Sequence, residues 1–284
     1  PKKIVFSGVG KTTDELNFAI DKKILLINAE SKSEVEEINK IANRKKKRVQ
    51  IGVRLNPNTD AKTLSQISTG KKENKFGVNQ KIFLQLVSYL KDSKYLNLKC
   101  LSVHIGSQIL NHKPYENMLK VIDKIISKSN HKFEYIDLGG GMGIDYEHNN
   151  SKLNLRKYSK NIQKFLKKNN SKIIFEPGRS IVGNSAVLIT KILYIKEGYK
   201  KDFVILDAAM NDLMRPALYG AKHRIIPSKK TKKVTKKSYE FVGPICESTD
   251  TFSIVKKYQK LNEKDFLVIC DVGAYGTSLA SNYN

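Results

Sequence analysis

Short apolar runs alternate with amphipathic patterns through the first two-thirds of the chain. The apolar runs predict strands at residues 3–6, 24–29, 49–55, 98–104, 135–138 and 172–175. Between them, apolar residues recur every three or four positions, as in Val35, Ile38 and Ala42, which is the spacing of a helix with one buried face. This alternation predicts parallel strands joined by crossover helices.

Two helix starts carry a capping pattern. Thr12 stands three positions before Glu15, and Ser31 stands three positions before Glu34. In a capping box the hydroxyl accepts from the backbone N–H three residues on, and the carboxylate there accepts from the backbone N–H of the cap. We therefore expect helices to begin at these two points.

The residues that follow three of the strands favour a barrel. They are His104-Ile105-Gly106-Ser107-Gln108, Gly139-Gly140-Gly141 and Glu176-Pro177-Gly178-Arg179. In a (β/α)8 barrel the carboxyl ends of the strands surround one mouth, where the active site lies. A closed barrel needs eight strand–helix units and only six are evident, so we expect an α/β barrel that lacks its first two strands. An open doubly wound sheet is the alternative.

The pattern changes from about residue 184. Strands are predicted at residues 185–195, 203–207, 239–242 and 266–269, with lysine-rich turns and few helices between them. We therefore expect two domains: a partial barrel over residues 1–183 and a mainly antiparallel β domain over residues 184–284.

The charge of the chain raises the question of an anionic partner. Its 284 residues include 52 Lys and Arg against 27 Asp and Glu, a formal net charge of +25, with clusters at residues 44–48 and 229–233. Nucleic-acid binding is one interpretation. However, no aromatic residues interleave the clusters as stacking platforms, so we favour solvated lysine-rich loops and expect no nucleic-acid partner.

Cysteine usage points to a reducing compartment. Cys100, Cys246 and Cys270 show no C-x-x-C spacing, so neither a disulfide framework nor a metal site is expected. No signal peptide and no apolar run of membrane-spanning length is evident. We expect a cytoplasmic protein without a membrane partner.

Three motifs at the predicted barrel mouth suit a phosphorylated ring cofactor. The amides of Gly139-Gly140-Gly141 can close around a phosphate, although a tight turn also needs glycine. His104 can stack on a ring, with Ser107 donating to the phosphate, or it can be a structural hydrogen-bonding residue. Glu176 beside a ring nitrogen keeps that nitrogen protonated. A plain salt bridge between Glu176 and Arg179 is the alternative.

The predicted β domain adds further candidate groups. Arg215-Pro216-Ala217-Leu218-Tyr219-Gly220 offers a fixed guanidinium and a phenol. Cys246 precedes Glu247, and a thiol titrates close enough to neutrality to act as a general acid, although most cysteines after strands are inert. Gly273-Ala274-Tyr275-Gly276 exposes a second phenol.

Together these segments resemble the fold-type III pyridoxal-phosphate decarboxylases, essentially from end to end. The resemblance implies a barrel of the alanine-racemase and ornithine-decarboxylase type with pyridoxal 5'-phosphate as its cofactor. Arg-Pro-Ala-Leu-Tyr-Gly and Cys-Glu-Ser are similar to members that convert meso-2,6-diaminopimelate to L-lysine and carbon dioxide, the last step of lysine synthesis. The other shared segments are Ile4–Lys11, Arg54-Leu55-Asn56-Pro57, Ile67-Ser68-Thr69-Gly70 and Asn74-Lys75-Phe76-Gly77.

The resemblance also implies roles for the matching positions. Glu176 would pair with the ring nitrogen, His104 would stack on the ring, and Cys246 from the partner subunit of a homodimer with shared active sites would return a proton. The residues that would hold the cofactor are His104, Ser107, Gly139, Gly140, Gly141, Glu176, Gly178, Arg179 and Tyr275. Those that would hold the amino-acid substrate are Arg179, Arg215, Tyr219, Glu247 and Tyr275.

The chain departs from the family pattern at three places. It has no Tyr-Ala-Val-Lys-Ala-Asn-like segment, which carries the Schiff-base lysine of the family, and it ends at Tyr283-Asn284, short of the usual last strand and helix. Leu64-Ser65-Gln66 replaces a histidine-containing segment of many relatives. We expect these residues alone to be inactive. The alternatives are a decarboxylase for arginine, ornithine or carboxynorspermidine, and a non-catalytic regulatory relative.

Overall fold

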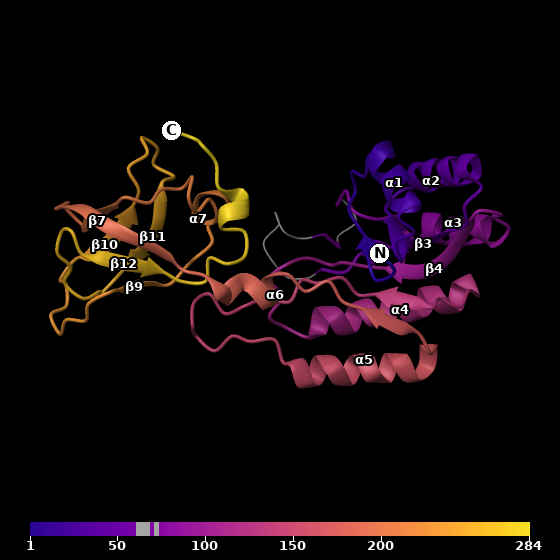
Figure 1. The fold of residues 1–284 in the computed structure, drawn as a ribbon. Coiled ribbons are helices and arrows are strands. Elements are labelled where there is room, and N and C mark those ends of the chain that lie inside the picture. The colour runs from indigo at the N-terminus through magenta and orange to yellow at the C-terminus, as the bar shows by residue number, and fades with distance from the viewer. Residues whose placement is uncertain (61–68, 71–73) are drawn as a thin grey trace. The chain divides into compact units, whose positions relative to one another are not determined.

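The computed structural model describes residues 1–60, 69–70 and 74–284, which form two compact units (Figure 1). The first unit comprises Pro1–Gly143 and Leu153–Pro177, and the second comprises Ile144–Lys152 and Gly178–Asn284. The domain boundary expected after residue 183 stays a prediction. Two of the sequence predictions fall outside the described residues: Leu64-Ser65-Gln66, and the first two residues, Ile67 and Ser68, of the shared segment that follows it.

The first unit is built on one parallel sheet whose strands follow each other in chain order. This order, β1-β2-β3-β4-β5-β6, has no reversal and therefore excludes the doubly wound alternative, which changes direction at a switch point. The expected partial barrel is confirmed. Its strands are β1 (Val5–Phe6), β2 (Leu26–Ala29), β3 (Val49–Arg54), β4 (Leu96–Ser102), β5 (Tyr135–Asp137) and β6 (Lys172–Ile174).

In the described part of this unit, five helices connect the strands and pack beside one another, α1 on α2, α3 on α4 and α4 on α5. Right-handed crossovers in one direction place every helix on the same face of a sheet. The apolar stripes seen in the sequence form the core between helices and sheet, with Val35, Ile38 and Met118 fully buried. The helices are α1 (Thr13–Asp21), α2 (Lys32–Lys45), α3 (Gln80–Lys91), α4 (Lys113–Ser129) and α5 (Leu155–Asn169).

The two predicted helix starts are both present, but only one is a full capping box. Thr12 and Glu15 exchange both bonds of the box. Ser31 caps the backbone N–H of Glu34 at 3.1 Å, whereas the Glu34 carboxylate accepts from the backbone N–H of Glu30 at 2.8 Å and from Lys11 at 2.6 Å. The Ser31 half of the second predicted box is therefore present. The Glu34 half is wrong, because the carboxylate binds the buried Lys11 and the N–H of Glu30 instead of the N–H of Ser31.

Two hydrogen bonds on the inner face show how strongly the sheet curls. The Asn28 side chain at β2 donates to Asp137 at β5 over 2.8 Å, and the Ser7 hydroxyl after β1 donates to Glu176 after β6 over 2.8 Å. Neighbouring strands lie about 4.8 Å apart, so a flat sheet would separate β2 from β5 by roughly 14 Å and β1 from β6 by roughly 24 Å. The sheet is therefore bent toward its inner face.

The second unit is a six-stranded mixed sheet in the order β11-β10-β8-β7-β12-β9. All its pairings are antiparallel except β8 with β10, so the expectation of a mainly antiparallel domain is confirmed. Sequence analysis missed β9 and β11. The strands are β7 (Leu188–Lys196), β8 (Lys201–Leu206), β9 (Ile225–Pro227), β10 (Ser238–Val242), β11 (Thr251–Val255) and β12 (Phe266–Ile269), with short helices α6 (Arg179–Val182) and α7 (Arg215–Tyr219).

Within the described ranges, no helix combines the length and apolar composition that crossing a bilayer requires.

Candidate active site

Three of the predicted site motifs meet at the carboxyl ends of the adjacent strands β4, β5 and β6. The backbone N–H of Gly140 donates to Nδ1 of His104 over 3.1 Å, and the backbone N–H of Glu176 donates to the carbonyl of Gly139 over 2.9 Å. The imidazole, the glycine turn and the carboxylate-bearing segment are therefore in direct contact. This is the arrangement that parallel strand order imposes on residues placed just beyond each strand.

The His104 ring is held in one protonation state. Burial and the Arg54 guanidinium lower the pKa of His104 to about 4, so the ring is neutral at pH 7. Because Nδ1 accepts from Gly140, the ring proton resides on Nε2. A neutral, fixed aromatic ring is suited to lie flat against another planar ring.

Close packing between strand ends explains the glycine turn. A Cβ on Gly140 would lie 2.1 Å from the Glu176 carbonyl oxygen, and a Cβ on Gly141 would lie 2.1 Å from the Gly106 carbonyl oxygen. The turn therefore requires glycine whether or not it binds a ligand. The turn also lies against Gly106, which directly precedes Ser107. The N–H groups of Gly139 and Gly140 already donate to Asp137 and His104, so binding of a phosphate by this turn stays a prediction.

A buried carboxyl group that sequence analysis missed lies beside Glu176. Asp137 is fully buried, and burial together with the Glu176 charge raises the pKa of Asp137 to about 7. Its Oδ1 accepts from the Gly139 N–H at 2.9 Å, and its Oδ2 accepts from Asn28 at 2.8 Å. The available signal was an acidic residue inside the apolar run Tyr135-Ile136-Asp137-Leu138.

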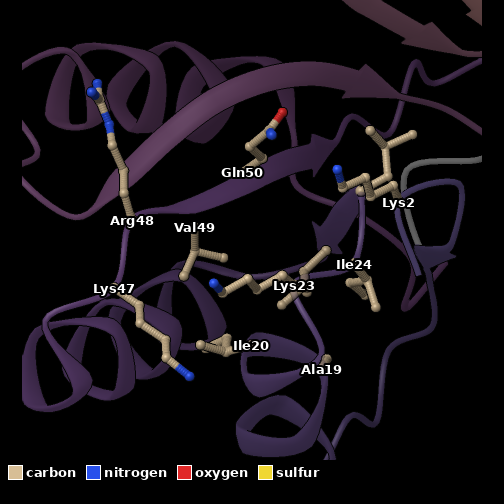
Figure 2. A pocket seen from close by; sticks show the side chains of 11 residues that line it. Lys2, Ala19, Ile20, Lys23, Ile24, Lys47, Arg48, Val49 and Gln50 are labelled. Carbon is tan, nitrogen blue, oxygen red and sulfur yellow. The ribbon is translucent and has the colours of Figure 1, made fainter.

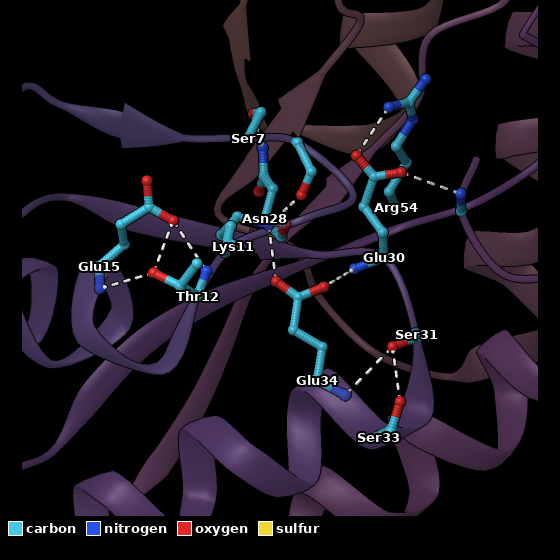
Figure 3. A network of polar contacts seen from close by, with 12 residues as sticks. Ser7, Lys11, Thr12, Glu15, Asn28, Glu30, Ser31, Ser33, Glu34 and Arg54 are labelled. Atoms are coloured by element: carbon cyan, nitrogen blue, oxygen red, sulfur yellow. Dashed lines mark hydrogen bonds and ion pairs between the residues drawn. The ribbon is translucent and has the colours of Figure 1, made fainter. Parts of the chain in front are cut away.

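Charged side chains that follow β1 and β2 or end β3 form a network of hydrogen bonds and ion pairs (Figure 3). The Lys11 amine, only 1% exposed, donates to the carbonyls of Gly8 and Asn28 at 2.6 and 2.7 Å and to Glu34 at 2.6 Å. Beside it, Arg54 pairs with the buried Glu30 at 2.8 Å. With three acceptors the Lys11 amine is saturated, so we regard it as structural rather than nucleophilic.

The second unit contains two buried guanidinium groups around one phenol. Arg179 Nη1 donates to the Tyr146 hydroxyl at 2.6 Å, and the Arg215 Cζ lies 4.3 Å from the centre of the Tyr146 ring. The Tyr275 ring, 4.9 Å from the Arg179 Cζ, adds a second aromatic contact. The structure thus brings together the two predicted site residues Arg179 and Arg215, whose roles stay a prediction, and adds Tyr146, which the sequence did not single out.

No carboxylate among the described residues pairs with either guanidinium, and Nε of both Arg179 and Arg215 has no hydrogen-bond partner there. Burial lowers the pKa of Arg215, and the charge of Arg179 adds to this effect. Buried cations without a counterion are costly unless an anion completes them. The cluster therefore has the chemistry of an anion-binding site.

The remaining predicted residues of the second unit differ in exposure. Tyr219 ends the same short helix that Arg215 begins, and it is half-buried. Cys246 is an exposed free thiol on the loop after β10. Its neighbour Glu247 is also exposed and accepts from the Tyr283 hydroxyl and from Thr249.

A pocket of about 630 Å³ lies at the opposite, amino-terminal end of β2 and β3 (Figure 2). Its lining combines the apolar Ile20 and Ile24 with the basic Lys2, Lys23 and Arg48. None of the predicted site residues lines this pocket. In barrels the amino-terminal end serves stability and the carboxyl end serves chemistry, so we place the candidate site at the other end. In the part of the chain that the structure describes, no cluster of three or more metal-ligating side chains occurs.

The chain matches the profile of the family described as "Pyridoxal-dependent decarboxylase, pyridoxal binding domain" over residues 1–183. It is similar to diaminopimelate decarboxylase of Aquifex aeolicus, with 39% identity covering 100% of this chain and 68% of the relative. The same enzyme of Helicobacter pylori strain J99 is 43% identical over 100% of this chain and 71% of the relative.

Solved structures give the same result. The crystal structure of diaminopimelate decarboxylase from Helicobacter pylori complexed with L-lysine superposes with a TM-score of 0.92 at 42% identity, covering 100% of this chain and 71% of that one. The enzyme from M. jannaschii, in co-complex with L-lysine, has a TM-score of 0.89 at 35% identity over 100% and 68% of the two chains.

Proposed function

Since this chain belongs to the diaminopimelate decarboxylases, a branch of the pyridoxal-dependent decarboxylases, we propose that the protein converts meso-2,6-diaminopimelate to L-lysine and carbon dioxide. The observation that supports this most directly is the contact between His104, the glycine turn and the Glu176 segment at three neighbouring strand ends. Two of the similar structures hold L-lysine, the product of the proposed reaction.

The residues of the first unit fit pyridoxal 5'-phosphate. When bound, this cofactor supplies an electron sink that stabilises the carbanion left by carbon dioxide. The neutral His104 ring would lie against the cofactor ring, and Ser107 with Gly139, Gly140 and Gly141 would hold the phosphate. Glu176 would keep a proton on the ring nitrogen, because a carboxylate favours the charged form of a neighbouring base.

The buried cations of the second unit suit the anionic groups of the ligands. We assign Gly178 and Arg179 to the cofactor phosphate, with Arg179 also facing the substrate. Arg215 would bind the substrate carboxylate that the reaction leaves untouched, because a guanidinium fork matches a carboxylate. Tyr219, Glu247 and Tyr275 would complete the contacts, with Glu247 binding the distal amine.

Cys246 is assigned to proton return, in the active site of the partner subunit of a homodimer. Its exposure in the single chain supports this assignment, since a thiol that serves a neighbouring subunit must be presented at the surface. We also propose a cytoplasmic location, which is supported by the three cysteines all being free thiols.

The proposed activity is tested with the full-length protein loaded with cofactor. Release of carbon dioxide and formation of L-lysine are measured from meso-2,6-diaminopimelate, in parallel with arginine, ornithine and carboxynorspermidine. Turnover restricted to diaminopimelate supports the proposal. Preference for another substrate would reassign the enzyme within its fold. No turnover of any of the four, with cofactor absorbance intact, would favour the non-catalytic alternative.

A further inference from the structure

Arg215 is held by a histidine that the proposed function does not use. Arg215 Nη1 lies 2.7 Å from Nε2 of His223, and Nδ1 of His223 lies 2.8 Å from the carbonyl oxygen of Cys270. Both side chains are buried, at 5% and 4% exposure. The loop that carries His223 is tied to the same residue a second time, because the Cys270 N–H donates to the Arg224 carbonyl over 2.9 Å.

The two contacts of His223 fix its protonation. A carbonyl oxygen only accepts, so Nδ1 must carry a proton, and a guanidinium only donates, so Nε2 must present its lone pair. The ring is therefore neutral. Burial agrees with this arrangement and, with the nearby Arg215 charge, lowers the pKa of His223 to about 4.

A neutral partner is unusual for a buried guanidinium, because buried charges are normally paired with an opposite charge such as a carboxylate. The groups facing His223 include one acid, Asp271, whose charge acts to raise the pKa of His223. However, Asp271 is bound to His148 at 2.7 Å. The other groups are the Tyr146 ring, 5.0 Å away in an edge contact, and the Arg179 charge. The Arg215 charge thus stays unneutralised.

We propose that His223 is a positioning residue that orients the Arg215 guanidinium through a neutral acceptor and so reserves its positive charge for the distal carboxylate of the amino-acid ligand. This rests on the proposed function. A carboxylate at position 223 would orient Arg215 equally well but would cancel its charge. An apolar residue would neither fix the orientation of Arg215 nor accept the hydrogen bond that its Nη1 donates.

The test measures binding of two ligands to the full-length, cofactor-loaded protein by calorimetry. L-Lysine keeps the carboxylate that the reaction leaves untouched, and 1,5-diaminopentane lacks it. We expect His223→Leu to weaken L-lysine binding by about tenfold or more and diaminopentane binding by less than about threefold. His223→Gln, which retains an acceptor near Nε2, should stay within about threefold of wild type, whereas His223→Glu should weaken L-lysine binding as His223→Leu does. His131→Leu is the matched control, since that half-buried histidine lies 3.1 Å from the Leu98 carbonyl in the first unit.

Several results would overturn this inference. Unchanged L-lysine binding in His223→Leu would remove the positioning role, and equal losses for both ligands would reduce it to general stability. Wild-type binding in His223→Glu would reject the requirement for neutrality. If His223→Leu does not fold, the comparison of His223→Gln with His223→Glu decides, since both retain an acceptor. A wild-type protein that neither binds L-lysine nor decarboxylates diaminopimelate would instead reject the proposed function.

Discussion

The carboxyl group of Asp137 lies next to that of Glu176 on the inner face of the curled sheet, within hydrogen-bonding reach. Burial disfavours the charged form of Asp137, and the neighbouring Glu176 charge repels it, so together they raise the pKa of Asp137 to about 7. Asp137 therefore retains a proton where an ordinary aspartate has lost it.

This pair predicts a pH dependence of stability. A folded-state pKa above the unfolded value means that stability is complete below about pH 4 and is lost as the pH rises to about 7. The loss is at most about 4 kcal/mol, at roughly 1.4 kcal/mol per unit. Urea unfolding at pH 5 and pH 8 should show up to about 3 kcal/mol of this loss in the wild type, since the part that is lost between pH 4 and pH 5 is already gone. It should be largely absent in Asp137→Asn, whose amide does not titrate, and an identical loss in both proteins would contradict the assignment.

Replacing Glu176 by glutamine should impair chemistry more than cofactor retention. The amide is similar in shape but has no charge to stabilise a protonated ring nitrogen, so we expect turnover of the full-length enzyme to fall by about 100-fold or more. Absorbance of the bound cofactor provides the control. Wild-type turnover at saturating cofactor would remove Glu176 from this role.

Glycine at position 140 should be irreplaceable for packing reasons alone. Gly140→Ala would place its Cβ 2.1 Å from a backbone oxygen of Glu176, so a strand end must move, and we expect a loss of about 1–3 kcal/mol in the free energy of unfolding. Gly10→Ala is the matched control, because nothing lies within 4 Å of the corresponding Cβ. Equal stability of the two variants would show that the turn is more adaptable than its contacts indicate.

Exchange of Cys246 tests both proton return and shared active sites. Cys246→Ala should fold normally, since the thiol is exposed, yet lose most turnover with cofactor bound. Mixing it with Glu176→Gln should restore activity, because a mixed dimer has one site that combines both intact residues. Random pairing predicts about a quarter of wild-type activity. No recovery in a mixture whose mixed dimers are demonstrated would reject the shared site.

Local patterns predicted most of the fold but few of the contacts. The strand expected at residues 49–55 is observed as Val49–Arg54, and the one expected at residues 98–104 ends at Ser102, with His104 already in the turn beyond it. The strands β9 and β11 were missed. The first has only three residues and lies at a sheet edge, and the second is a five-residue edge strand that pairs only with β10.

Local sequence patterns could not predict which residues contact the site residues, because these contacts join positions far apart in the chain. Asn28 and Asp137 are separated by 109 positions and meet only because the sheet curls. Tyr146 and His223 likewise meet through folding, their rings 5.0 Å apart. The sequence did contain a weaker indication of these contacts, which is a polar residue within an apolar run, as at Asn28 in Leu26–Ala29.

Tyr146 lies in a stretch of nine residues that belongs to the second unit although the chain on both sides belongs to the first. The polypeptide thus crosses between the units three times, and neither is a contiguous cassette. A chimera that exchanges only the carboxyl-terminal stretch from Gly178 onward would separate Tyr146 from both of its arginines and mix parents within one cation cluster. Grafting the second unit from a relative therefore requires transplanting Ile144–Lys152 together with the carboxyl-terminal stretch.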